Sequence, residues 1–364
     1  MIVEKNFKSV AEIFYSQLNQ NIKSGAAFAV YKNGKALIDI YGGYQKKNIP
    51  WDKNTIVNIH STGKGIVLMC ISKLIDEGIL DLDEYVFNYW PEFKRNNKQK
   101  IKVKHVLQHQ SGLYGWKEKM KVSDLINNYY CNKLIAKQEA FHEPGEATCY
   151  HAMTIGYIIN KIFKNLTGMT VGKYIKNILI KDKKIKCFIG TPKSMHKNIA
   201  ETKEISNLNK KKFKKNDIYY RRVFQNPKVT VADTNKKEWI MAEIPSLNCH
   251  SNASSLAILY DQFNKKEKVI SYKTFKKIIK IENYSMDYVL RIPIKWSSIG
   301  YIIDGGKLFG NSKKSYGHTG VGGSLAFSDP DSKISVAYTP SFLSENNYND
   351  DRATKLIEEV YRKL

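Results

Sequence analysis

The sequence has few cysteines and no long apolar run, and each shortage argues against a class of protein. No apolar segment approaches the roughly 20 residues that a membrane-spanning helix needs, so no transmembrane segment is expected. The first residues, Met-Ile-Val-Glu-Lys-Asn, lack the apolar core of a signal peptide. The cysteines are odd in number and have no paired spacing: Cys70, Cys131, Cys149, Cys187 and Cys249. Reduced thiols and a cytoplasmic location are therefore expected.

Several catalytic signatures are also missing. The sequence has no G-x-S-x-G motif, which argues against an α/β-hydrolase. His142, Cys149 and His151 are conceivable metal ligands, but no C-x-x-C or H-E-x-x-H motif supports them, so neither a metal nor another cofactor is expected. The segment Gly317 to Ser324 superficially resembles a phosphate-binding loop. Glycine stands at position 323, where such a loop needs lysine.

Positive charge is in large excess. The net charge is +25, and 53 of the 59 basic residues are lysine. A positive field attracts polyanions, but so much lysine beside abundant asparagine, isoleucine and tyrosine is typical of AT-rich coding sequence. The densest cluster, residues 210–215, lies in a polar stretch of about 196–240 that has no clear periodicity. We interpret it as a solvated loop, with an anionic surface or acidic partner as the alternative, and expect no specific nucleic-acid partner.

One motif stands out against this background. Ser61-Thr-Gly-Lys64 precedes a run, Ile66 to Ile75, whose apolar residues recur at helical spacing, and Gly78 follows as a C-terminal cap. Residues three apart share a helix face, so Lys64 is expected beside the Ser61 hydroxyl. A neighbouring amine whose pKa is lowered can take the proton of a serine nucleophile. The alternative is that Ser61 merely caps the helix and Lys64 is a solvated charge.

Two later segments favour the catalytic interpretation. Tyr150 lies in the loop 144–152, before an apolar periodic stretch, and can present its hydroxyl to a cleft. The glycine-rich segment 317–324 leads into an alternating run that predicts a hairpin turning at residues 329–331. Glycines beside a strand let a ligand approach the backbone and leave N–H groups available as oxyanion donors.

Together these segments resemble the serine β-lactamase and penicillin-binding-protein superfamily, specifically β-lactamase-related esterases close to class C β-lactamases and family VIII carboxylesterases. Residues 50–93 look like the nucleophile region of that family. Residues 105–113, His-Val-Leu-Gln-His-Gln-Ser-Gly-Leu, are similar to its L-L-x-H-x-S-G-L signature. The match is ordered and runs from about Gly25 to Asp351. From the residues themselves we interpret His105 and His109 as structural histidines that fix a loop.

The resemblance implies a role for each site residue. Ser61 would be the acyl-accepting nucleophile, Lys64 its partner in proton transfer, and Tyr150 a general base and then an acid toward the leaving group. The backbone N–H groups of Ser61 and Val321 would form the oxyanion hole, helped by the helix N-terminus. The substrate-binding residues would be His151, His318, Thr319 and Gly320.

Two departures from the β-lactamase pattern bear on the substrate. Ala152 stands where the Y-x-N motif has asparagine, which removes an amide, and His318 replaces the lysine of K-T-G. Imidazole is mostly neutral near pH 7 and is expected to protonate toward pH 6, so a permanent cation for a substrate carboxylate is missing. Both changes are familiar in the esterase-like branch and favour an ester over a β-lactam.

The predicted fold is α/β (α+β), an antiparallel sheet flanked by helices with a helical subdomain, as in the superfamily. Residues 1–364 are expected to form one catalytic domain, with an α/β subdomain at about 1–80 and 240–364 and a helical subdomain with the basic loop region at about 81–239. The predicted helices cover about 7–19, much of 61–180, 254–263 and 351–362. The predicted strands cover about 26–31 and 36–41, around an Asn33-Gly34 turn, and 298–303, 324–328 and 334–338.

The expected function is that of a cytoplasmic serine hydrolase, which forms an acyl-enzyme on Ser61 and hydrolyses small-molecule esters. A β-lactamase or D-alanyl-D-alanine carboxypeptidase activity is the enzymatic alternative, and the carboxypeptidase would require export. A non-catalytic scaffold or a polyanion-binding protein is the alternative of another class. The joint presence of Ser61, Lys64 and Tyr150 argues against that last hypothesis.

Overall fold

The sheet starts with a hairpin that the sequence encodes directly. Asn33 and Gly34 both adopt left-handed backbone angles, with φ of 53° and 87°, as a two-residue hairpin turn requires. The apolar strand before the turn has a neighbouring strand on each side and is almost entirely buried. The computed structural model describes residues 1–19, 24–180, 182, 184–204, 217–264, 269–344 and 350–364.

The main sheet is antiparallel between every pair of neighbouring strands, in the order β1-β3-β2-β14-β13-β12-β11-β10-β9, and β4 pairs with β3. Its strands are β1 (Ile2–Val3), β2 (Gly25–Lys32), β3 (Lys35–Lys46), β4 (Ile49–Pro50), β9 (Ile281–Asp287), β10 (Ile292–Ser297), β11 (Ile302–Ile303), β12 (Tyr316–Thr319), β13 (Leu325–Asp329) and β14 (Ile334–Pro340). Two smaller sheets are β5 (Val57–Asn58), β8 (Cys249–Ser251) and β6 (Cys187–Ile189), and β15 (Phe342–Leu343) with β7 (Lys203–Glu204).

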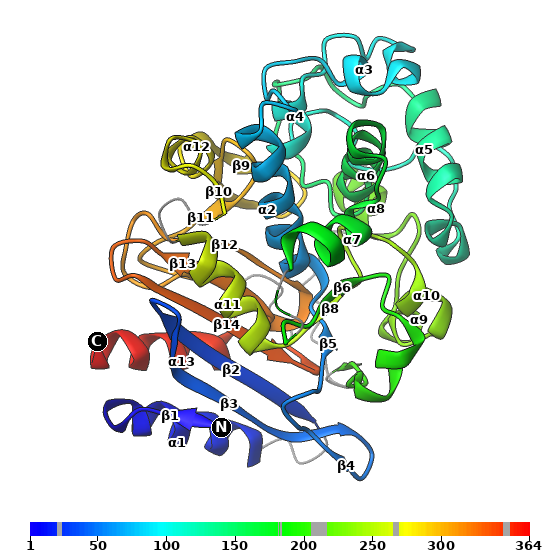
Figure 1. Ribbon diagram of the computed structural model, residues 1–364. Helices are drawn as coiled ribbons and strands as arrows, with labels where there is room; N and C mark the ends of the chain where they lie inside the picture. The colour runs from blue at the N-terminus through cyan, green and yellow to red at the C-terminus, as the bar shows by residue number, and fades with distance from the viewer. Residues whose placement is uncertain (20–23, 181, 183, 205–216, 265–268, 345–349) are drawn as a thin grey trace.

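Helices cover both faces of the main sheet (Figure 1). The terminal helices α1 (Lys8–Asn19) and α13 (Asp351–Lys363) pack together on one face, and α11 (Ala253–Asn264) covers the other. The core-facing positions of α13 are apolar at Leu356, Ile357 and Val360, the spacing of an amphipathic helix. The predicted antiparallel sheet flanked by helices is therefore confirmed.

The remaining helices gather above one end of the sheet, around α2 (Gly63–Asp76) and α6 (Thr154–Thr167) (Figure 1). Shorter helices complete this part: α3 (Val86–Tyr89), α4 (Val103–Leu107), α5 (Asn128–Lys137), α7 (Val171–Tyr174), α8 (Ile218–Phe224), α9 (Val231–Thr234), α10 (Lys237–Met241) and α12 (Tyr272–Ile278). The remaining short helical segments are η1 (Lys5–Phe7), η2 (His60–Thr62), η3 (Pro91–Lys94), η4 (Val122–Ile126), η5 (Ile175–Leu179), η6 (Lys193–Asn198) and η7 (Val321–Gly323).

Two expectations about local structure are wrong. The polar stretch of about 196–240, with no clear periodicity, predicts a loop, but from residue 217 on it contains α8, α9 and α10. The side chains of Asp217 and Thr230 cap the first two of these helices. The lysine cluster 210–215 lies outside the described residues. The strand expected at about 298–303 shrinks to β11, while the preceding hairpin of β9 and β10 was not predicted at all, because its turn uses Arg291 rather than glycine or asparagine at a positive φ of 60°.

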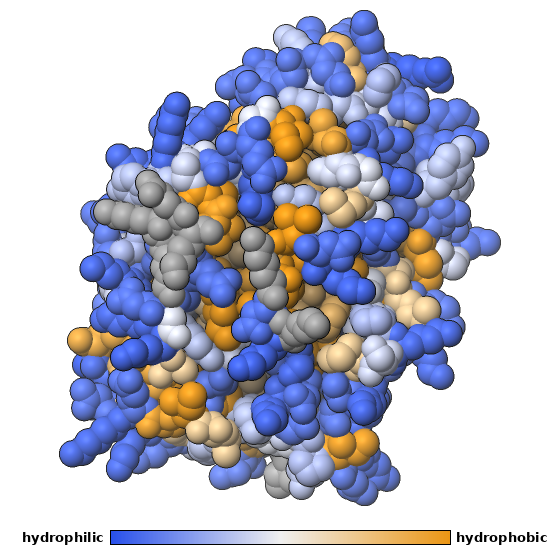
Figure 2. Space-filling view, in the orientation of Figure 1, coloured by the Kyte–Doolittle hydropathy of each residue, from blue (hydrophilic) through white to orange (hydrophobic). Residues whose placement is uncertain are grey.

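Polar side chains cover most of the face seen in Figure 2, and apolar side chains gather in its central part. In the described part of the chain, no helix is both long and apolar enough to cross a bilayer.

Candidate active site

Ser61 lies at a sharp turn between a strand and a buried helix. The chain leaves β5 and passes through η2 before α2 begins at Gly63. His60, directly before Ser61, has a φ of 47°, and its N–H donates to Asn58 Oδ1 at 3.0 Å. A residue other than glycine is strained in the left-handed conformation and keeps it only where the surrounding structure fixes it. The Ile59 N–H donates to the Cys249 carbonyl at 2.9 Å, which pins this turn to β8.

Lys64 is buried one turn after Ser61, with only 4% of its surface exposed. Its Nζ lies 2.9 Å from Ser61 Oγ, 3.0 Å from the Ala152 carbonyl and 2.9 Å from the Ser246 carbonyl. Burial without a carboxylate partner among these contacts lowers the pKa of Lys64 well below its ordinary value. The alternative of a capping serine beside a solvated lysine is therefore wrong, because α2 has no side-chain cap and Lys64 is out of water.

A neutral amine can keep all three contacts of Lys64. A neutral amine has two N–H donors and one lone pair, whereas the ammonium form has three donors. Two of the three partners are carbonyl oxygens, which can only accept, and the third is a hydroxyl, which can donate. Once deprotonated, Lys64 keeps both carbonyl contacts and directs its lone pair at the Ser61 hydroxyl.

Tyr150 closes the group from a neighbouring loop. It is buried, and burial raises the pKa of its phenol while a hydrogen bond to the Ser61 side chain opposes part of that rise. Lys64 Nζ lies 5.1 Å from the centroid of the Tyr150 ring. The structure thus brings Ser61, Lys64 and Tyr150 together, and it gives Tyr150 a protonated hydroxyl at neutral pH.

His109 holds the loop on both sides of Tyr150. The Cys149 N–H donates to the His109 carbonyl at 2.9 Å, and the His151 N–H donates to His109 Nδ1 at 3.1 Å. His109 itself has a φ of 61° and lies beyond the end of α4. The interpretation of this histidine as one that fixes a loop is confirmed.

His151 does not occupy the substrate-binding position that the resemblance implies. Its Nδ1 contacts the Cys149 carbonyl and its Nε2 contacts Ser111 Oγ, both at 2.6 Å. The residue has no exposed surface, because these contacts hold the ring in the interior of the protein. His151 therefore supports the Tyr150 loop.

His318 lies on β12 and is 2% exposed. Its Nδ1 is 2.7 Å from the Thr319 carbonyl, an acceptor, so Nδ1 carries the proton and Nε2 is an acceptor. That Nε2 is buried and has no hydrogen-bond partner among the described residues. Burial lowers the pKa of His318 to about 3. The expectation that this ring protonates near pH 6 is therefore wrong.

The segment after His318 is fastened to the turn that carries Ser61. The Gly320 N–H donates to the Ser324 carbonyl at 2.7 Å, and Ser324 Oγ donates to the Ile59 carbonyl at 2.8 Å. Thr62 Oγ1 donates to the Ser324 carbonyl at 3.0 Å. Thr319 is 8% exposed, while Val321 is 38% exposed. Hydrogen bonds therefore join the loop with Val321 to the turn with Ser61.

Two residues near the site had no signal in the sequence. Trp296 on β10 is fully buried, and its ring stacks on Tyr150 at a centroid distance of 6.2 Å and meets His109 at 4.6 Å. Asp287 ends β9, and burial raises its pKa to about 6 although the N–H groups of Leu290, Tyr150 and Val289 oppose that rise. Both residues belong to the hairpin that the sequence did not reveal.

A small pocket borders this group, and its polar lining comes from Lys64, His109, Ser246 and His318. The rest of its wall is largely apolar, which accounts for the desolvation of the lysine. Within the described ranges, no group of three or more histidine, cysteine, aspartate or glutamate residues is arranged to hold a metal ion.

Comparison with known proteins identifies the family. The sequence model described as Beta-lactamase matches residues 11–360. The chain belongs to the β-lactamase family. It is 24% identical over 358 residues to Esterase/beta-lactamase LipL of Mycobacterium tuberculosis, covering 92% of this chain and 81% of LipL. It is 28% identical over 184 residues to Protein flp of Staphylococcus aureus, covering 48% of this chain and 36% of flp.

Two solved structures share the fold over the whole chain, each with a TM-score of 0.92. One is a family VIII carboxylesterase, 28% identical, and the match covers 100% of this chain and 99% of that chain. The other is a penicillin-binding-protein homologue from Caulobacter crescentus, 27% identical, with the same coverage. The β-lactamase-family chain is thus a hydrolase of the serine type, and the predicted resemblance and fold class are confirmed.

Proposed function

We propose that this β-lactamase-family chain is a carboxylesterase that forms an acyl-enzyme on Ser61. The observation that carries the proposal is the buried Lys64 amine, held by the Ala152 and Ser246 carbonyls with Ser61 Oγ as its third partner at 2.9 Å. An amine held in this way is a base of fixed direction. A lysine kept in place only for packing would not need a nucleophile at that position.

In the proposed reaction, Ser61 Oγ attacks the ester carbonyl as its proton moves to neutral Lys64. The N–H groups of Ser61 and Val321 bind the oxyanion of the tetrahedral intermediate. Collapse of the intermediate breaks the bond to the alcohol, and Tyr150 donates its proton to the departing oxygen, taking one back from Lys64. Water then attacks the acyl-enzyme by the same route in reverse, releasing the acid and restoring Ser61.

The choice of ester over β-lactam depends on two side chains. Neutral His318 offers an acceptor at Nε2, which attracts a hydroxyl group and does not bind a carboxylate. Ala152 supplies no side-chain amide. The family VIII carboxylesterase neighbour supports ester hydrolysis. The name of LipL joins esterase to β-lactamase, so β-lactam hydrolysis is the second candidate, expected to be weak.

The test is a panel of p-nitrophenyl acyl esters and β-lactams given to the wild type and to Ser61→Ala. Wild type should hydrolyse short neutral esters, and the variant should lose that activity while keeping its circular dichroism spectrum. Mass spectrometry of quenched wild type should find the acyl group on Ser61. Ester hydrolysis that survives in Ser61→Ala, or an adduct on another residue, would refute the mechanism. An inert wild type that binds polyanions would favour the non-catalytic alternative.

A further inference from the structure

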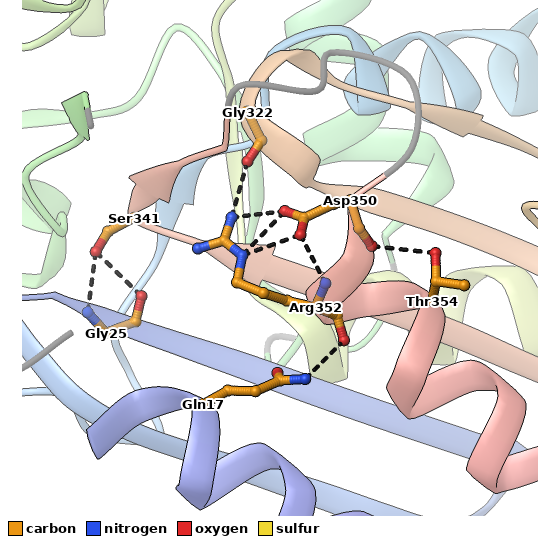
Figure 3. A network of polar contacts seen from close by, with 7 residues as sticks. All are labelled: Gln17, Gly25, Gly322, Ser341, Asp350, Arg352 and Thr354. Atoms are coloured by element: carbon orange, nitrogen blue, oxygen red, sulfur yellow. Dashed lines mark hydrogen bonds and ion pairs between the residues drawn. The ribbon is translucent and has the colours of Figure 1, made fainter. Parts of the chain in front are cut away.

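An ion pair at the start of the last helix reaches the loop that carries Val321 (Figure 3). We call residues 320–324 the oxyanion loop. Arg352, in the first turn of α13, donates from Nη2 to the Gly322 carbonyl at 3.2 Å. The same guanidinium donates to both carboxylate oxygens of Asp350, through Nε at 3.0 and 3.1 Å and through Nη2 at 2.6 Å. The loop is thus tied to a helix on the far side of the sheet from α11.

The oxyanion loop contains two adjacent glycines and depends in part on contacts from outside the loop. Gly322 and Gly323 have φ values of 84° and 103°, a conformation that glycine adopts freely and that leaves it with much entropy to lose. A Cβ on Gly323 would lie 1.7 Å from Asp350 Oδ2, so Asp350 occupies the place of the missing side chain. The Ser344 N–H also donates to the Gly322 carbonyl, at 2.9 Å. Contacts from outside the loop therefore add to the two hydrogen bonds within it, from the Gly320 N–H to the Ser324 carbonyl at 2.7 Å and from the Gly323 N–H to the Gly320 carbonyl at 3.1 Å.

The ion pair is built for positioning rather than for binding an anion. The Asp350 side chain is 2% exposed and the Arg352 side chain 19%. Asp350 also accepts from the Arg352 backbone N–H at 2.9 Å, which fixes the first turn of α13. Because Asp350 neutralises the guanidinium with a two-pronged contact, little attraction is left for a substrate carboxylate.

We propose that Arg352 and Asp350 are positioning residues for the oxyanion hole, acting through the Gly322 carbonyl on the Val321 N–H, two peptide units earlier in the chain. The inference rests on the proposed function, in which that N–H binds the oxyanion. Loss of the contact lets the Gly322–Gly323 peptide rotate, and the change reaches the Val321 N–H through the backbone of Val321 and Gly322. A donor displaced by about 1 Å loses much of its effect on the transition state. Ground-state binding of the ester, which places little charge there, stays nearly unchanged.

The experiment compares Arg352→Gln and Arg352→Lys with a matched control, Arg362→Gln. Arg362 lies on the same helix and forms a similar paired contact, with Glu359, but no described contact of its side chain reaches the oxyanion loop. Steady-state hydrolysis of p-nitrophenyl butyrate gives kcat and KM separately. Inhibition by phenylboronic acid, whose serine adduct is tetrahedral, reports the oxyanion hole without turnover.

Arg352→Gln should lower kcat about 10- to 100-fold, with KM within about threefold of wild type. The inhibition constant for phenylboronic acid should rise in step with the loss of kcat/KM. Arg352→Lys, which cannot form the two-pronged contact, should give values of kcat and of the inhibition constant between those of wild type and Arg352→Gln. Arg362→Gln should match wild type.

Unchanged kcat and boronic acid inhibition in Arg352→Gln would overturn the positioning role while leaving the proposed function standing. An equal loss in Arg362→Gln, or failure of both Arg352 variants to fold, would also overturn it, since the ion pair would then serve stability alone. A wild type that neither hydrolyses esters nor reacts with a fluorophosphonate would instead refute the proposed function, and the oxyanion role with it.

Discussion

Two lysines, Lys64 and Lys98, are both buried, and the Nζ of each contacts three oxygen atoms. The two differ in the kind of oxygen that they contact. Lys98 has no exposed surface, and its Nζ donates to the carbonyls of Arg95 and Ala136 at 2.9 Å and of Gln138 at 2.5 Å. Burial lowers the pKa of Lys98 to about 8. The pKa of Lys64 is also lowered by burial, yet one of its three partners is a hydroxyl.

The comparison teaches that burial and a lowered pKa do not by themselves mark a catalytic lysine. Lys98 satisfies three acceptors near the end of α5 and has no group to activate. Lys64 has Ser61 in reach and the ring of Tyr150 beside it. Chemistry therefore depends on what the amine faces.

The largest effect is expected from replacing each lysine by methionine. Lys64→Met removes the general base, and kcat for ester hydrolysis should fall about 10³-fold, within the usual range for such a base. Lys98→Met should keep kcat within about threefold of wild type, because its contacts end at backbone carbonyls. Steady-state kinetics on the folded variants checks both. Equal losses in the two variants would erase the distinction.

Acidification should weaken the fold through the histidines beside Lys64. Burial lowers the pKa of His318 to about 3 and that of His109 well below its ordinary value. Their folded pKa values lie below the unfolded value of about 6.5, so stability is complete above pH 6.5 and is lost as the pH falls. Each should remove about 1.4 kcal/mol per pH unit below 6.5. The opposite sign holds for Asp287, whose pKa is raised to about 6, so its contribution is lost as the pH rises through 6.

Urea unfolding at pH 7.5, 6.5 and 5.5 measures this loss. The variant His318→Gln, which cannot protonate, should show a shallower dependence on pH than wild type. Equal slopes in the two proteins would contradict a neutral, proton-excluding ring at position 318.

Lys98→Met should lower the stability of the protein although it leaves kcat nearly unchanged. Removing the amine leaves the Arg95, Ala136 and Gln138 carbonyls without that donor. The free energy of unfolding should drop by about 1–3 kcal/mol, measured by urea denaturation at pH 7.5. An unchanged midpoint would show that water replaces the ammonium without loss.

The smallest effect concerns substrate charge. Since the pKa of His318 is lowered to about 3, the ratio of kcat/KM for a neutral ester and its carboxylate-bearing analogue should stay constant from pH 7.5 to 6. His318→Lys should shift that ratio toward the anion by about tenfold. His196→Lys, a change at η6, is the control and should leave the ratio alone. A pH-dependent ratio in wild type that disappears in His318→Gln would contradict the neutral ring.

Local sequence predicted much of this molecule and missed what depends on distant partners. The Asn33-Gly34 hairpin, the α2 helix after Ser61 and the amphipathic α13 follow from turn chemistry and periodicity. The spacing of Ser61 and Lys64 places them on one face of a helix. These features need only neighbours in the chain.

The surroundings of Lys64 could not be predicted in the same way. Its second and third partners, Ala152 and Ser246, lie 88 and 182 residues away in sequence. Trp296 and Asp287 belong to a hairpin without a recognisable turn. The difference between Lys64 and Lys98 could not be predicted for the same reason, because their burial depends on packing against residues distant in the sequence.

Labelling by a fluorophosphonate tests the central claim most directly, since it reports activation of Ser61 without a leaving alcohol or a deacylation step. The second-order rate of labelling would be measured for wild type, Lys64→Met and Lys98→Met, with the labelled residue located by peptide mass spectrometry. We predict a label on Ser61 in wild type and Lys98→Met at similar rates, and a rate at least about 100-fold lower in Lys64→Met. Wild-type labelling of Lys64→Met, or a label on a residue other than Ser61, would contradict the account.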